Sequence, residues 1–141
     1  MSGILLTYQP IILQVMILLH LVSQSNANFN QRAGIYLLNN LACQVNTELK
    51  VLLSKMGAVE TILQLIYEKL KLGHSDYVME TAWSALWNVT DESPVNCERF
   101  LTSDGLTLFI KCKVTVGVVT SVFILFLFRE GSPTNPHCWV I

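Results

Sequence analysis

A tryptophan, an asparagine and an aspartate are spaced so that one helix face would present all three. Ser84, Trp87, Asn88 and Asp91 follow one another at i, i+3, i+4 and i+7. At about 100° per residue, this spacing places the four side chains within an arc of roughly 100°. A separate arc is apolar and is formed by Val78, Ala82, Ala85, Leu86 and Val89. The segment 76–90 is therefore predicted to be a helix with a buried back and a polar, aromatic front.

Each side chain of that front has a chemical use. The Asn88 amide can donate to a peptide carbonyl and accept from a peptide N–H. The Trp87 indole offers a flat apolar wall that also attracts cations. Asp91 places a negative charge at the helix C-terminus, which the helix dipole disfavours by a few tenths of a kcal/mol, and a cationic ligand would relieve this. The set suits the N-terminal amine of a peptide.

The same residues have plainer interpretations. Asn88 would then only bridge neighbouring helix ends, Asp91 would cap a helix beginning near Ser93, and Trp83 and Trp87 would both be core residues. Asn88-Val89-Thr90 also reads as an N-x-T glycosylation sequon, which matters only in a secreted chain.

Apolar spacing and terminating residues predict a series of helices. Gly57 and Gly73 end two of them, Ser75 or Asp76 caps another, and Ser93-Pro94 supplies an N-cap and a first helical position. The predicted helices are Asn30–Gln44, Thr47–Met56, Ala58–Leu72, Asp76–Thr90, a short helix from Ser93 towards Leu101, and one from Leu106 to Cys112 that follows a break at Gly105.

These helices repeat. YLLNNLACQ (36–44) aligns with SALWNVTDE (84–92), which places Asn40 on Asn88 at an offset of 48 residues. LSKMGAVETILQLI (53–66) falls on LTSDGLTLFIKC (101–112), with Gly57 on Gly105. The unit resembles an armadillo repeat of two or three helices. We expect an all-α, armadillo-like solenoid fragment of about two repeats over residues 30–112, the alternative being two unrelated helix pairs.

The two ends of the chain read differently. Within residues 1–29, Ile11 to Val22 carries a helical apolar stripe, with Pro10 in its predicted first turn, so this segment is an incomplete repeat or a signal-like sequence. Within residues 113–141, Val114 to Phe128 is an uncharged run whose β-branched residues favour a strand, and it is short for a membrane helix. We expect a divergent, hydrophobic, non-family tail.

Composition excludes several functional classes. The chain has 141 residues, of which 52% are hydrophobic and 13% charged, and its net charge is −1, which argues against nucleic-acid binding. Cys43, Cys97 and Cys112 are expected to be buried free thiols in a reducing compartment, the cytoplasm or the nucleus. His137-Cys138 is an isolated couple, so we expect no metal and no other cofactor. No G-x-S-x-G motif or catalytic cysteine context points to an enzyme.

The stretch 81–112 carries a more specific signal. The phrase SALWN-x-TDE-x-P, followed by C-x-x-F and G-x-x-L-F, resembles the zyg-eleven/zer-one family over about residues 30–112. The resemblance implies a substrate receptor of cullin-two RING ubiquitin ligases, in which leucine-rich repeats precede an armadillo-like solenoid. It also implies a concave groove that captures substrate proteins with an exposed N-terminal glycine, lined here by Trp87, Asn88 and Asp91, with Ser84 beside them.

This sequence departs from the family pattern. The family completes the pocket with an asparagine and a glutamate of the next repeat, and it carries a cullin-binding segment before the solenoid. Neither is recognisable here, so we expect a non-catalytic recognition fragment, a splice product or a mispredicted gene model. The alternative is a small secretory or membrane-anchored protein that uses residues 11–22 and 114–128.

Overall fold

The computed structural model is described here for residues 2–24, 28–73 and 75–116, and this part of the chain contains helices and no strand. The helices are α1 (Ser2–Ser23), α2 (Asn28–Gln44), α3 (Thr47–Lys55), α4 (Ala58–Lys71), α5 (Tyr77–Thr90), α6 (Pro94–Thr102) and α7 (Gly105–Val116). The all-α prediction is confirmed, and the predicted bounds of α2 to α6 agree with these to within two residues.

Local chemistry explains where most of these helices begin. The side chain of Asn46 accepts a hydrogen bond from the Leu49 N–H at 3.0 Å, and Asp76 does the same for Met79 at 3.0 Å. Gly57, at φ 89°, supplies the left-handed turn between α3 and α4, a conformation open to glycine at little cost. Pro94 occupies the first turn of α6, as predicted.

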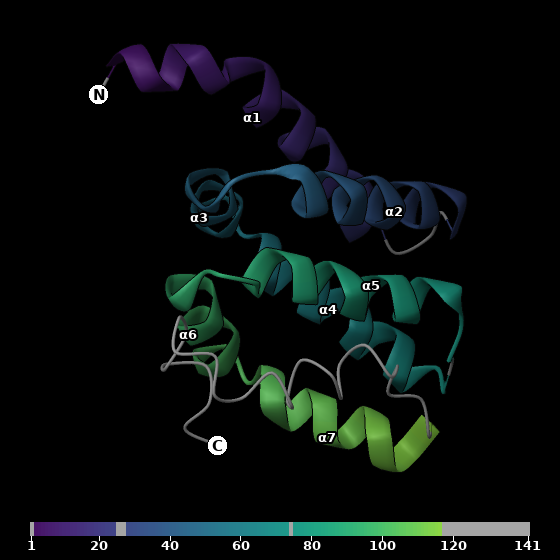
Figure 1. Cartoon of the computed structure of the whole chain (residues 1–141). Helices are drawn as coiled ribbons and strands as arrows, with labels where there is room; N and C mark the ends of the chain where they lie inside the picture. The colour runs from purple at the N-terminus through teal and green to yellow at the C-terminus, as the bar shows by residue number, and fades with distance from the viewer. Residues whose placement is uncertain (1, 25–27, 74, 117–141) are drawn as a thin grey trace.

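The helices stack in the order that the repeat predicts. Helix α2 packs on α5, while α1 packs on α4 and α4 on α7. Helices α3 to α5 therefore form one complete three-helix unit, with α1 and α2 before it and α6 and α7 after it. Figure 1 shows α1 and α2 at one end of this stack and α7 at the other.

One continuous core joins the units. The predicted apolar back of α5 is buried throughout, and Trp83, which has no exposed surface, meets the edge of Phe109 of α7 with ring centroids 5.7 Å apart. Val15, Leu18 and Val22 of α1 belong to the same core. This burial confirms the helical stripe predicted in the first thirty residues, and it is what a repeat helix requires.

Helix α1 differs from the prediction at its beginning. It begins at Ser2, so Pro10 lies inside the helix and not in its first turn. A proline removes one backbone hydrogen bond and clashes with the preceding turn, which bends a helix. The axis of α1 changes direction along its length in Figure 1, as an internal proline explains.

The C-terminal run is only partly described. Val114 lies in α7, so the predicted strand is wrong for 114–116, and the rest of that run lies outside the described residues, as do His137 and Cys138. None of the helices in the described ranges is long and apolar enough to span a membrane. No group of histidine, cysteine and acidic residues in these ranges could hold a metal ion.

The cysteines only partly follow the prediction. Cys112 is buried and free, and burial raises the pKa of its thiol from 9.0 to about 11. Cys43 is free but exposed on α2. Cys97 is buried but disulfide-bonded, so the prediction of a free thiol is wrong at this position.

Candidate functional site

The polar front of α5 forms as its spacing predicts. The four residues of this front, Ser84, Trp87, Asn88 and Asp91, are all half-buried. The five apolar residues predicted for the opposite side of the helix are all buried. Trp87 also packs against the core, so its indole is partly structural. The helix thus offers an amide and an aromatic ring next to its C-terminal carboxylate.

The Asn88 amide is held by a neighbouring helix. Its Nδ2 atom donates to Oδ1 of Asn39 on α2, at 2.8 Å. The bridging role that the sequence left open is therefore real. This bond uses one of the two N–H donors of the Asn88 amide. The other N–H and the amide carbonyl oxygen are not part of it. The contact fixes the amide plane between α2 and α5.

Asp91 ends helix α5. Its N–H donates to the Trp87 carbonyl at 2.8 Å, and Glu92 follows in the left-handed region at φ 55°. A non-glycine residue pays a small steric cost in that region. The resulting tight turn lets α6 begin at Pro94 and leaves the Asp91 side chain at the end of the α5 front.

A lysine lies at the same helix end. Nζ of Lys50, a buried residue of α3, donates to the backbone carbonyl of Asp91 at 3.1 Å. A cation at a helix C-terminus is favourable because it meets the negative end of the dipole. The charge relief that we expected from a ligand alone is thus partly supplied by the protein.

A buried asparagine secures this end of α5. Nδ2 of Asn96, on α6, donates to the carbonyls of Lys50 and Val89, at 2.8 Å each. Three helices meet at one amide, so the position of Asp91 depends on α3 and α6 as well as on α5.

Sequence reasoning missed both Asn39 and Lys50. The repeat alignment identified Asn40 as the counterpart of Asn88, but the residue that accepts the Asn88 hydrogen bond is Asn39, the neighbour of that counterpart. The only available signal was the Asn39-Asn40 pair itself. Lys50 carried no signal, because its contact with Asp91 depends on how two helices pack.

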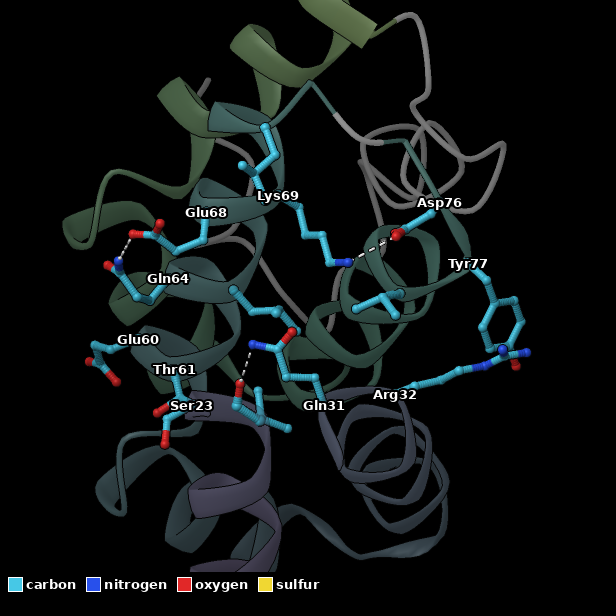
Figure 2. Close-up of a pocket in the computed structure, with 14 residues that line it drawn as sticks. Ser23, Gln31, Arg32, Glu60, Thr61, Gln64, Glu68, Lys69, Asp76 and Tyr77 are labelled. Carbon is cyan, nitrogen blue, oxygen red and sulfur yellow. Dashed lines mark hydrogen bonds and ion pairs between the residues drawn. The ribbon is translucent and has the colours of Figure 1, made fainter. Parts of the chain in front are cut away.

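A separate cavity lies away from this front. It has a volume of about 790 Å³ and opens between the end of α1, the start of α2, and helices α4 and α5. Figure 2 shows Lys69 reaching across it to Asp76, Gln31 bonded to a backbone carbonyl of α1, and Arg32 against the Tyr77 ring. None of the predicted site residues lines this cavity.

Comparison with known proteins decides the family. The sequence model of a family described as "Protein zer-1 homolog-like, C-terminal domain" matches residues 5–122. The chain belongs to this zer-1 homolog-like family. The match is wider at both ends than the 30–112 expected from the motifs, and it includes most of α1.

Individual zer-1 relatives agree. The chain is 50% identical over 99 residues to "Protein zer-1 homolog" of Drosophila melanogaster and 47% identical over 97 residues to "Zyg eleven-related protein 1" of Caenorhabditis elegans. It is 51% identical over 82 residues to the human "Protein zer-1 homolog". These alignments cover 70%, 68% and 58% of this chain but only 12%, 11% and 11% of the relatives. The chain therefore spans about a tenth of their length.

Proposed function

We propose that this chain is a non-catalytic recognition module of the kind found in substrate receptors of cullin-RING ubiquitin ligases. Membership of the zer-1 homolog-like family supports the receptor assignment. The partners would be substrate proteins, and the cullin-RING components would be partners only of a protein that also carries the docking segment. This role would place it in the cytoplasm or the nucleus, although a disulfide-bonded residue such as Cys97 is unusual in those compartments.

The proposed ligand is a protein N-terminus that begins with glycine. Its amine would pair with the Asp91 carboxylate, its main chain would bond the Asn88 amide, and its first residues would lie along the Trp87 indole. Ser84 would border the peptide one helical turn further along α5. The observation that carries this proposal is that all four side chains share one half-buried face of α5, opposite a wholly buried one.

The alternative of a small secretory or membrane-anchored protein is less well supported. The apolar stripe of α1 that would serve as a signal or anchor is packed into the core. Only 1% of the surface of Val15 and of Val22 is exposed there.

Removing the Asp91 charge tests the proposal. Asp91→Asn keeps the size of the side chain but cannot form an ion pair with an amine, so binding of a fluorescent glycine-starting peptide should weaken at least tenfold, equivalent to about 1.4 kcal/mol. Fluorescence polarisation with the full chain measures this. Glu80→Gln, an exposed charge removal at the other end of α5, should leave affinity unchanged.

The peptide itself provides the second half of the test. Acetylating its N-terminus removes the positive charge that Asp91 would pair with, so binding should be lost to the same degree. Equal binding of acetylated and free peptides would refute amine capture.

A further inference from the structure

One hydrogen bond joins the α5 front to the preceding unit of the stack. Helices α2 and α5 lie side by side and pack against each other, as Figure 1 shows. Across this contact, Nδ2 of Asn88 donates to Oδ1 of Asn39 at 2.8 Å, and both residues are half-buried. The orientation of one proposed binding residue on α5 therefore depends on a side chain of α2.

The bonded pair leaves the Asn88 oxygen open. An asparagine amide has one oxygen and two N–H groups, and the bond to Asn39 uses an N–H of Asn88. With the part of the chain that the structure describes, the Asn88 side chain makes no other hydrogen bond, and its oxygen is not among the buried side-chain atoms that lack a partner. The Asn88 oxygen is therefore accessible to solvent.

The contact with Asn39 decides which end of the Asn88 amide a ligand would meet. The last torsion of an asparagine side chain has a broad, roughly twofold preference, so an unbonded amide presents its oxygen or its nitrogen with similar ease. The bond holds the Asn88 nitrogen against Oδ1 of Asn39 on α2. The oxygen is then kept at the other end of the amide, on the same helix face as the Asp91 side chain.

A fixed acceptor at this place suits the proposed ligand. Residues 88 and 91 are three apart, and side chains with this spacing are neighbours on a helix surface. An N-terminal ammonium group carries three N–H donors, so the Asp91 carboxylate and the Asn88 oxygen can accept from the same group. With the amide turned the other way, the N–H groups of Asn88 would face the donors of the peptide.

We propose that Asn39 is a positioning residue for peptide binding, and that it acts by holding Asn88 with its oxygen towards the peptide. This inference rests on the proposed function. It makes the affinity for the peptide depend on α2, a helix that carries none of the proposed contact residues. It requires no contact between Asn39 and the peptide itself.

Replacing Asn39 in the full chain tests the proposal. Asn39→Leu is similar in size but has no acceptor, so the affinity for a fluorescent glycine-starting peptide should fall about fivefold in fluorescence polarisation. Asn39→Asp keeps an acceptor for the Asn88 N–H and should bind as the unaltered chain does at high salt, where the attraction of the added charge for the peptide amine is screened. Gln44→Leu makes the same kind of change at an exposed position of α2 and should leave the affinity unchanged.

A double variant separates positioning from a direct or purely structural role. Asn88→Leu should weaken binding more than Asn39→Leu does, because it removes the acceptor itself. Adding Asn39→Leu to Asn88→Leu should cause no further loss of affinity, because no amide is left to be held. Losses that add would overturn the proposal, since Asn39 would then act on the peptide directly or through the stability of the fold.

The failure of this inference and that of the proposed function give different results. If the unaltered chain prefers the glycine-starting peptide to its acetylated form, and Asn39→Leu binds it equally well, Asn39 is no positioning residue and the proposed function stands. If the unaltered chain does not prefer the free N-terminus, amine capture is refuted and the role of Asn39 with it.

Discussion

Lys69 lies almost fully buried between α4 and α5, and one carboxylate balances its charge. Nζ of Lys69 lies 2.9 Å from Oδ2 of Asp76, while Oδ1 of Asp76 caps α5 through the Met79 N–H. The two oxygens of one side chain thus perform two tasks, as Figure 2 shows for the ion pair. Their contributions can be separated because asparagine can cap a helix but cannot neutralise a lysine.

Replacing Asp76 should therefore lower stability in two steps. Asp76→Ala removes the cap and leaves a buried ammonium group unpaired, so the free energy of unfolding should fall by about 2 kcal/mol. Asp76→Asn restores the cap acceptor and should lose about half as much. Urea unfolding followed by circular dichroism measures both. If both variants lose the same free energy of unfolding, the cap contributes nothing to stability. If the free energy of unfolding of Asp76→Asn is unchanged, the ion pair contributes nothing.

The candidate site shows what residue spacing can and cannot predict. Which residues share the front of α5 follows from helix geometry alone, so Ser84, Trp87, Asn88 and Asp91 could be grouped from sequence. What Asn88 and Asp91 bond to depends on neighbouring helices, and Asn39 and Lys50 come from positions 49 and 41 residues away in the chain. Periodicity carries no information about such partners.

At the scale of helices, α1 and α2 approach each other closely at Gly34. A Cβ atom added to Gly34 would lie 2.9 Å from Cβ of Leu21 and 3.2 Å from the backbone nitrogen of Val22. The equivalent position in α5 is Ala82, so the α4–α5 pair accommodates a methyl group where α1–α2 does not. The close approach of α1 and α2 at this point therefore requires a residue without a Cβ atom.

Gly34→Ala should consequently destabilise the chain. Helix propensity alone would favour alanine by about 1 kcal/mol, but the clash involves backbone that cannot rotate away, and overpacking of this kind typically costs about 1–3 kcal/mol. We expect a net fall in the urea midpoint. Asn40→Ala, at an exposed position of the same helix, should raise it slightly. A stabilised Gly34→Ala variant would show that α1 can move away from α2.

Helix boundaries could be predicted where a residue with one favoured role stands at the helix end. The predicted boundary was wrong where no such residue marks the end. Asp76, Gly57 and Pro94 each have one favoured role at a helix end, and α4, α5 and α6 begin where these residues indicate. Pro10 misled the prediction because proline is favoured in a first turn. Proline is also tolerated inside a helix at the loss of one backbone hydrogen bond, and α1 begins at Ser2, before Pro10.

At the scale of the whole molecule, the main contacts among the described helices run within a unit or between neighbouring units. Helix α4 packs against α1 on one side and α7 on the other, and α5 contacts α2, α4 and α6. The outer helices have a neighbouring unit on one side only among the described residues. In such arrays stability is approximately a sum of unit and nearest-neighbour terms, so the interior should open least often.

Hydrogen exchange should reveal this gradient. Amides of α4 and α5 should exchange most slowly, and those of α1 and α7 fastest. Ile35→Val, a buried change in α2, should cost about 1 kcal/mol and accelerate exchange in α1 and α2 more than in α6 and α7. Phe109→Leu in α7, which weakens the contact with Trp83, should do the reverse. Equal acceleration of all amides by both variants would mean that the chain unfolds as one cooperative block, and that the repeat describes its construction but not its energetics.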